Sequence, residues 1–525
     1  MASEDTAAEL GRLLTEAARV FPAYVQQSQH NDTRVAGTSE AGDTPDHPVP
    51  KAGDKPDRLF PEVGNKLDLS FPETGVGKGI WDDVRAVCAG ATNTWSSQFL
   101  YKLYAAPTPI GVVGETLLGV LNNNAHVIRA SPSGAAIEHA VATKLAQLAQ
   151  FPATAGGLTF PGGSYSNLHA LMTARNTRFP HIQQRGLQGT RLSVFTSAHA
   201  HYSIDKAAVA AGIGLDNVVR VPTDADGRMD VSELRRLMRA AAARESEPFF
   251  VNATMGTTVL GACDPVAGIA AVCAEFSAWL HVDGAWGGPL ALFADVFEAP
   301  GAFADSFTVN PHKLLGVPQQ CSFLLVRRGI QVMHDALGLR AGYLFHEESD
   351  PSRSGDADLL YGDDGPNRFT NAGDATLGCG RRPDAVKFWL MWRYYGTQYF
   401  SARVQHARSM ALRLAALVRS RLAGSGRWEL VAEPPGTCVC FWFVHRTMDT
   451  SREQSGAATR RICDRINDAG KMMLDYASVD RFVDGKFDAL PEFFRIPVNS
   501  PAVTEETLCV VLDAIEQTAI ELFGK

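Results

Sequence analysis

The sequence predicts an α/β fold built around a mostly parallel β-sheet. Short apolar runs typical of buried strands lie at residues 192–196, 249–253, 279–282 and 322–326. Stretches with helical spacing of apolar residues lie among them, at residues 137–148, 231–243 and 265–276. Strands that alternate with helices are typical of parallel sheets covered by helices.

The two ends of the chain differ from this central pattern. Residues 4–20 have helical spacing, whereas residues 28–57 are polar and rich in Asp, Thr, Gly and Pro, as in a surface arm. A helix-rich region at 384–422 and a last helix at 505–522 follow the centre. We therefore expect an N-terminal segment at 1–83, a large α/β domain at 84–395 and a small C-terminal domain at 396–525. The large domain would begin with a helical part to about residue 125 and carry a long loop at 347–375 that is rich in Gly, Asp, Ser and Asn.

Composition excludes several classes of protein. The 525 residues carry a formal charge of −8, and nucleic-acid binding needs a basic surface. We find no apolar run of about 18–20 residues that would span a membrane, and no secretory signal at the start. The nine cysteines are scattered, which argues against a zinc site or a disulfide framework. We expect a protein of the reducing cytoplasm that binds neither nucleic acid nor membrane.

Lys313 is the first candidate for chemistry. A single Lys is usually a solvated surface charge, but this one follows Asn310-Pro311-His312 and precedes the apolar run 314–317. Burial disfavours the ammonium form and lowers the pKa, which yields an amine that can form a Schiff base.

Asp283 is the second candidate. It ends the apolar run 279–282, and open α/β sheets bind ligands at the carboxyl ends of their strands. Alone, such an Asp often only caps a turn. Together, a Lys and an Asp are what a pyridoxal phosphate enzyme requires, because the Lys binds the aldehyde and the Asp keeps the pyridine nitrogen protonated.

Two further stretches suit the same cofactor. Residues 160–167 form a Gly-rich turn before a helical stretch, and such a turn offers backbone N–H groups to a phosphate. His201 follows the strand-like run 192–196, where an imidazole could stack on a cofactor ring. Each feature alone is weak, since a Gly-Gly-Ser turn or a lone His is more often structural.

In this order, the four features resemble the group II pyridoxal-phosphate-dependent amino-acid decarboxylases, with the closest likeness to the glutamate and cysteine sulfinate decarboxylases. The likeness covers roughly residues 80 to 525. The stretches that carry it are FPGGSYSNLHALMTAR, HAHYSIDKAA, VNATMGTTVLGACDP, WLHVDGAWGG, NPHKLLGVPQQCS, GDATLGCGRRPDAVKFWLMW and EFFRIPVNSP.

The resemblance implies a role for each matching residue. Lys313 would carry the Schiff base, Asp283 would pair with the pyridine nitrogen, and His201 would stack on the ring opposite Ala285. The resemblance also implies contacts to the cofactor or its phosphate for Ser164, Tyr165, Ser166, Thr254 and Asn310. It further implies the fold-type I, aminotransferase-like arrangement, and a homodimer with the active site at the interface.

For the substrate, the resemblance points to Arg495, which matches the Arg that holds a substrate carboxylate in the glutamate and sulfinate enzymes. Lys102 and Tyr104 stand where those enzymes have small polar contacts, and Lys102 would either bind an acidic side chain or be solvated. Glutamate, aspartate and cysteine sulfinate are the candidate substrates, and a less common amino acid remains open.

One departure leaves the product open. In the family a loop Tyr is thought to protonate the substrate carbon, whereas Phe369 or Thr370 stands at that position here. We expect Tyr361 or His312 to donate this proton and an amine to form. The alternatives are decarboxylation coupled to oxidative deamination, which yields an aldehyde, and a non-catalytic binding protein, which the retained Lys313 disfavours.

Overall fold

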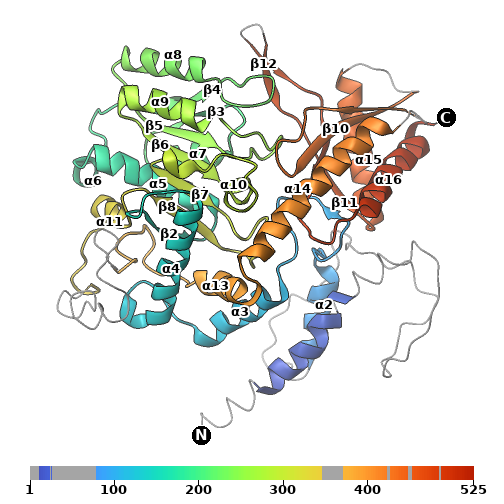
Figure 1. Cartoon of the computed structure of the whole chain (residues 1–525), viewed down its shortest axis with the longest axis horizontal. Coiled ribbons are helices and arrows are strands. Elements are labelled where there is room, and N and C mark those ends of the chain that lie inside the picture. The colour runs from blue at the N-terminus through green and yellow to red at the C-terminus, as the bar shows by residue number, and fades with distance from the viewer. Residues whose placement is uncertain are drawn as a thin grey trace.

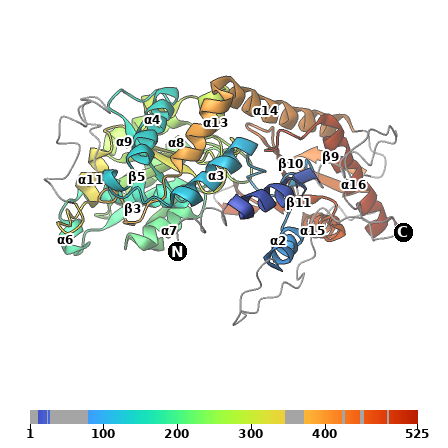
Figure 2. The same ribbon diagram turned by 90° about the horizontal axis from the view of Figure 1, so that it is seen from below.

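The computed structural model describes residues 11–23, 25–26, 79–345, 371–421, 426–446, 452–483 and 486–524. Two sheets lie side by side, and the long helix α14 (Thr397–Ser420) extends from the domain of one sheet to the domain of the other (Figures 1 and 2). The larger sheet belongs to the middle of the chain and the smaller one mainly to its C-terminal part.

The larger sheet has seven strands in the order β2-β8-β7-β6-β5-β3-β4. The neighbours from β7 to β4 pair in parallel, and β8 is antiparallel to both β7 and β2. This confirms the predicted α/β fold with a mostly parallel sheet. The strands are β2 (Gly156–Phe160), β3 (Leu192–Ser197), β4 (Val218–Val221), β5 (Glu247–Thr254), β6 (Trp279–Gly284), β7 (Ser306–Val309) and β8 (Ser322–Val326).

Helices cover both faces of this sheet because successive strand residues point to opposite sides. Phe250 packs into a core with α5, α7 and α11, whereas Val251 packs into a second core with α4, α8, α9 and α10. The helices of the first layer are α5 (Gly163–Arg178), α7 (Ser203–Ala210) and α11 (Gln331–Leu337). Those of the second are α4 (Pro132–Leu148), α8 (Val231–Ala242), α9 (Val266–Phe276) and α10 (Gly288–Phe293).

The smaller sheet has the order β1-β11-β14-β10-β9, and its strands other than β1 pair antiparallel. Residues of α14, α15 and α16 form its core. Its elements are β1 (Phe99–Leu100), β9 (Gly426–Leu430), β10 (Cys438–His445), α15 (Arg452–Ala469), β11 (Met473–Ala477), β14 (Phe493–Pro497) and α16 (Glu505–Phe523). In a separate two-stranded sheet, β12 (Asp480–Val483) pairs antiparallel with β13 (Lys486–Ala489). Since β1 comes from the N-terminal part of the chain, the domain boundaries near residues 83 and 395 stay a proposal.

Three further helices belong to the larger domain: α3 (Pro109–Leu121), α6 (Ile182–Arg185) and α13 (Ala385–Tyr395). α2 (Ile80–Gly90) lies on the side of the smaller sheet (Figures 1 and 2). The helix-rich region predicted at 384–422 is two helices, α13 and α14, because Gly396 between them has a φ of 76° that a continuous helix cannot contain. The predicted N-terminal helix is described over residues 11–23, and of the predicted loop 347–375 only residues 371–375 are described. Within the described ranges, no helix is both long enough and apolar enough to cross a membrane.

Candidate active site

A cavity of about 560 Å³ opens where several strands of the larger sheet end. β5, β6 and β7 reach it at their carboxyl ends, and α5 and α7 begin beside it, which is the usual ligand position in open α/β sheets. Nine of the candidate residues that the sequence singled out lie at this cavity. The lining consists of Tyr104, Gly163, Ser164, Asn167, His201, Tyr202, Thr254, Gly256, Thr258, Asp283, Ala285, Trp286, Asn310, His312, Lys313 and Gln319.

Asp283 is buried in the last part of β6 and held by two donors. Asn167 Nδ2 donates to its Oδ2 at 2.8 Å, and the backbone N–H of Ala285 donates to its Oδ1 at 3.0 Å. Both donors fix the orientation of the carboxylate at the cavity that Asp283 lines.

Asn167 and His281 extend this arrangement, and sequence reasoning missed both. His281 Nε2 lies 3.0 Å from Asn167 Oδ1, and its Nδ1 lies 2.8 Å from the Ser306 hydroxyl. Because burial lowers the pKa of His281 to about 4, the ring is neutral, and Nε2 donates to the amide oxygen. Strand periodicity was the available signal, since His281 and Asp283 are two residues apart and share a face.

Lys313 lies shortly after β7, and it is one of the residues that line the cavity. Burial lowers the pKa of its ammonium, the charge of Asp283 opposes that shift, and the charge of Arg495 adds to it. A lowered pKa increases the fraction of free amine at neutral pH, as a Schiff-base lysine requires.

The Gly-rich turn forms one side of the cavity. Gly162 has a φ of 106°, and α5 begins at Gly163, so backbone N–H groups of the first helical turn lie next to Ser164 at the cavity. Asn310 accepts a hydrogen bond at Oδ1 from the Ser322 hydroxyl at 2.6 Å, and that hydroxyl also lies 2.8 Å from Ser166 Oγ.

Ser166 therefore acts on Asn310 through the Ser322 hydroxyl, and Ser166 is not among the residues that line the cavity. Tyr165 is 53% exposed and is also not among the residues that line the cavity. Its backbone N–H donates to the carbonyl of Gly162 in the Gly-rich turn. The order of these residues in sequence did not reveal which of them face the cavity.

His201, Thr254 and Ala285 lie at the cavity, as the motifs suggested. His201 Nδ1 accepts the Ser203 N–H at 3.2 Å, and burial lowers the pKa of the ring despite the opposing charge of Asp283. A neutral, oriented imidazole suits stacking on an aromatic ring. Thr254 Oγ1 is buried and has no hydrogen-bond partner among the described residues, so a bound group could supply one.

The two candidate proton donors stand differently. His312 lines the cavity, and its Nδ1 is held by the backbone of Cys321, 2.6 Å from the carbonyl and 3.0 Å from the N–H. Burial lowers the pKa of His312 to about 4, so its ring is neutral at neutral pH. Tyr361 lies outside the described residues.

Two of the three candidate substrate residues form an ion cluster with a carboxylate. Arg495, in β14, pairs with Asp475 of β11, and Lys102 Nζ lies 3.0 Å from the same Asp475 oxygen. Tyr104 lines the cavity, whereas Arg495 and Lys102 are not among the described lining residues. Sequence reasoning missed Asp475, because no motif contains it and only the pairing of β11 with β14 brings it to Arg495.

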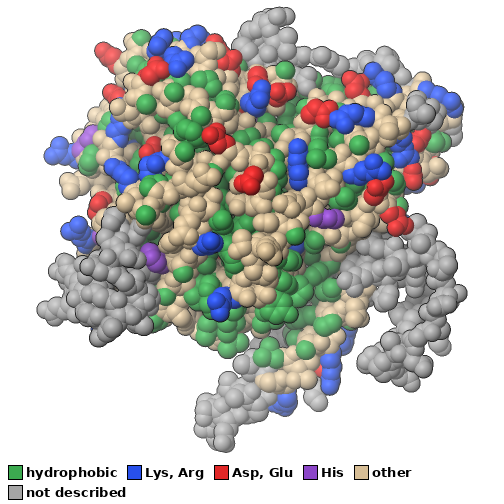
Figure 3. Space-filling model, in the orientation of Figure 1, with side chains coloured by type: hydrophobic (Ala, Val, Ile, Leu, Met, Phe, Trp, Pro, Cys, Tyr) green, Lys and Arg blue, Asp and Glu red, His purple; other side chains and the backbone are tan. Residues whose placement is uncertain are grey.

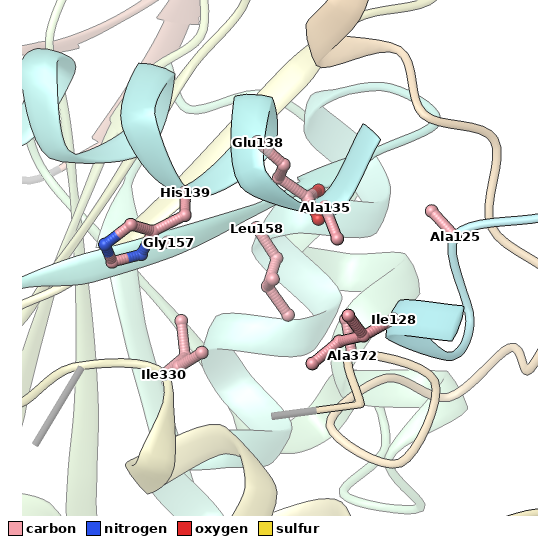
Figure 4. A pocket seen from close by; sticks show the side chains of 9 residues that line it. All are labelled: Ala125, Ile128, Ala135, Glu138, His139, Gly157, Leu158, Ile330 and Ala372. Carbon is pink, nitrogen blue, oxygen red and sulfur yellow. The ribbon is translucent and has the colours of Figure 1, made fainter. Parts of the chain in front are cut away.

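A second cavity, near α4, has a volume of only about 10 Å³, which is room for one water at most (Figure 4). Figure 4 shows it lined mainly by apolar side chains. Its one carboxylate, Glu138, is already paired with Arg381, accepts the Thr159 N–H at 2.7 Å and contacts the Thr159 hydroxyl. This cavity is structural.

The residues of the large cavity fit pyridoxal phosphate. Its volume lies in the range of cofactor sites, about 300–1,000 Å³. It combines an amine of lowered pKa, an oriented carboxylate, a neutral imidazole and a helix N-terminus. The Thr254 hydroxyl at this cavity is buried and has no partner among the described residues, and a bound ligand would give it a hydrogen bond.

Comparisons with known proteins agree with this interpretation. The family model "Pyridoxal-dependent decarboxylase conserved domain" matches residues 61–444. The chain is 37% identical over 445 residues to the L-aspartate decarboxylase of Metarhizium robertsii, covering 83% of both chains. It is 34% identical over 447 residues to the cysteine sulfinic acid decarboxylase of Rattus norvegicus, covering 83% of this chain and 85% of that one. The crystal structure of mouse CSAD superposes with a TM-score of 0.78 at 31% identity, covering 88% of this chain and 93% of that one.

Proposed function

Because the chain belongs to the pyridoxal-dependent decarboxylase family, we propose that its large cavity decarboxylates an amino acid with an acidic side chain. The protein is a carboxy-lyase with pyridoxal 5'-phosphate as its cofactor, and the motif resemblance is confirmed. The observation that carries the assignment of the site is one cavity holding both a half-buried Lys313 of lowered pKa and an oriented Asp283.

We assign the roles of the site residues from their surroundings. When bound, pyridoxal phosphate supplies an electron-accepting ring that stabilises the carbanion left when carbon dioxide departs. Lys313 would present its amine to the aldehyde, and the carboxylate of Asp283 would hold a proton on the ring nitrogen. His201 and Ala285 would flank the ring, while Ser164, Asn310 and the first turn of α5 would hold the phosphate.

An acidic side chain of the substrate is supported by Arg495. Its side chain is buried, and Nε has no partner among the described residues, so an anion near it would satisfy an unpaired donor. The two relatives described above are named for decarboxylating aspartate and cysteine sulfinic acid. Aspartate and cysteine sulfinate are therefore our first candidates, ahead of glutamate.

The expected product is the amine, which requires a proton at the substrate carbon. His312 is a poor imidazolium donor because burial lowers its pKa to about 4. Of the two candidate proton donors, this favours Tyr361 over His312. The role of Tyr361 stays a prediction.

We also propose a homodimer of the cytoplasm. Five apolar side chains of α3 are at least 36% exposed: Val112, Val113, Leu117, Val120 and Leu121. Figure 3 shows hydrophobic side chains gathered at the lower centre of this face, where Figure 1 places α3 and α13. A patch of this kind favours a protein partner, here a second copy, and all nine cysteines are free, which suits a reducing compartment.

The test is carbon dioxide release by the purified protein loaded with pyridoxal phosphate. Aspartate, cysteine sulfinate and glutamate are compared with tyrosine and lysine, and amine, aldehyde and hydrogen peroxide are measured in parallel. We expect release from an acidic amino acid, equimolar amine, and loss of both in Lys313→Ala. Release only from the non-acidic amino acids would refute the substrate class, and aldehyde with peroxide would refute the amine product.

A further inference from the structure

Three charged side chains from distant parts of the sequence meet directly behind the cavity wall. Lys102 Nζ lies 3.0 Å from Asp475 Oδ2, and Arg495 pairs with the same oxygen. Arg495 Nη1 donates to the carbonyl of Thr258 at 2.9 Å, and Thr258 lines the cavity. Tyr104, two residues after Lys102, lines it as well. We call Lys102, Asp475 and Arg495 the ion triad.

The charges of the ion triad do not cancel, since two cations share one carboxylate and leave a net charge of +1. The side chains of Arg495 and Asp475 are only 6% and 11% exposed, and that of Lys102 is 44% exposed. Water therefore screens the buried part of the triad weakly, and its net charge acts over several ångströms. The cavity is within reach of this charge, because Arg495 contributes to the lowered pKa of Lys313.

Asp475 has no evident structural need for its carboxylate beyond the two cations. Among the described residues, its other oxygen accepts the N–H of the adjacent Tyr476, at 3.0 Å. The backbone pairing of β11 with β14 already places residue 475 opposite Arg495. The Asp475 carboxylate thus lowers the charge of the triad from +2 to +1. The pairing of β11 with β14 does not depend on this carboxylate, because backbone hydrogen bonds make it.

We propose that the net charge of the ion triad sets how strongly the active site prefers an acidic side chain, and that Asp475 is the residue that limits this preference. The inference rests on the proposed function, because it assumes that the substrate binds in the cavity lined by Thr258 and Tyr104. It assigns specificity to a sum of charges and not to Arg495 alone. Replacing one member is then compensated by replacing another of opposite charge.

A charge series tests this. Lys102→Met gives a triad charge of 0, Asp475→Asn gives +2, and the double variant Lys102→Met/Asp475→Asn restores +1. We measure kcat and KM for the best acidic amino acid, and separately the inhibition constants of succinate and glutarate, which lack an amine and cannot react. Thermal midpoints of unfolding are recorded for each protein.

We expect Lys102→Met to raise KM and the inhibition constants by about tenfold with little change in kcat, as a loss of roughly 1.4 kcal/mol in electrostatic binding gives. The double variant should return to within about threefold of the original protein, and Asp475→Asn should bind the dicarboxylates more tightly. Lys471→Met, the same replacement at an exposed lysine, is the matched control and should change nothing.

Failure of the double variant to recover, with thermal midpoints unchanged, would refute the charge-sum proposal and favour a specific contact of Lys102. Equal losses in both single variants, together with lowered midpoints, would show that the triad is structural. If carbon dioxide comes only from non-acidic amino acids, the proposed substrate fails. The dicarboxylate constants then still decide whether the triad charge acts on the cavity.

Discussion

At the scale of single residues, the site depends on side chains that hold other side chains. Asn167 is the clearest case, because its amide joins Asp283, His281 and Ser203. The amide group can satisfy a donor and two acceptors at once, and all four groups are buried. Its contribution is therefore the orientation of Asp283, with no direct role in bond breaking.

We expect Asn167→Ala to weaken pyridoxal phosphate binding by about 10–100-fold, the cost typical of losing a residue that orients a ligand. The variant leaves Asp283 with one donor fewer and His281 Nε2–H without an acceptor. Cofactor affinity is measured by absorbance titration.

Ser203→Ala is the control, because it removes only the third partner of Asn167. It should bind the cofactor nearly as well as the original protein. Equal affinity of Asn167→Ala and the original protein would contradict the orienting role.

A second residue-scale prediction concerns pH. His169 Nδ1 lies 2.8 Å from the Tyr165 carbonyl, and its Nε2 accepts the Leu377 N–H at 2.9 Å, so both nitrogens are engaged by backbone in the neutral ring. Burial lowers the pKa of His169 to about 4 from an ordinary value of 6.5. Between these values the unfolded chain binds a proton that the folded chain does not, so stability is complete above pH 6.5 and is lost as the pH falls toward 4.

His169→Gln should therefore flatten the fall in thermal midpoint between about pH 7.5 and about pH 5. The full effect of this one group is at most about 3 kcal/mol. Asp264, whose pKa burial raises to about 7, acts in the opposite direction, but equally in both proteins. Parallel pH profiles for the two proteins would contradict the prediction.

At the scale of elements, helix α5 organises the site. Its first turn lies at the cavity, Asn167 holds Asp283, and His169 ties the helix to residue 377. Gly163 leaves a close fit at the start, because a Cβ there would lie 3.0 Å from Asn310 Nδ2 and 3.1 Å from the Ala285 Cβ. A side chain at this position would push on two cavity residues at once.

Gly163→Ala should accordingly weaken pyridoxal phosphate binding by about tenfold, since overpacking of this kind typically costs about 1–3 kcal/mol. Gly378→Ala is the matched control, because a Cβ there meets nothing within 4 Å. Cofactor affinity and thermal midpoint are measured for both. Unchanged affinity in Gly163→Ala would show that α5 and Asn310 can separate without cost to the site.

The strands and the site residues can be compared with what the sequence predicted. The buried strands were predictable because continuous apolar runs of about 4–8 residues, bounded by polar residues, match the length of a strand and are too short for most helices. The motifs placed Lys313, Asp283, His201, Thr254 and Ala285 at one cavity, as the structure does. What sequence could not supply was contact between distant segments: Asp475 meets Arg495 only through β11 and β14, and Asn167 meets His281 only because α5 packs on β6.

At the scale of the whole molecule, the apolar face of α3 is a feature that the packing of the described residues leaves unexplained. Gly111, Gly114 and Leu118 are buried, and α3 packs against α13. Val113, Leu117 and Val120 recur at spacings of four and three residues, so they share the opposite face, and Val113 and Val120 are 58% and 54% exposed. Water contact with such a stripe is unfavourable, and burial against a second copy removes it.

We therefore expect the double replacement Val113→Lys/Val120→Lys to convert a dimer into a monomer. Two ammonium groups placed in an apolar interface would lose their hydration without gaining partners, at a cost of several kcal/mol. The mass in solution is measured by light scattering over a range of protein concentrations, with carbon dioxide release measured on the same samples. Val209→Lys on α7, where the side chain is 54% exposed, is the control and should keep the mass of the original protein. If the active site lies at the interface, the monomer loses activity with its partner, whereas a monomer of full activity would place the site within one chain. An original protein that is itself monomeric would refute the dimer and leave α3 as the surface for a different partner.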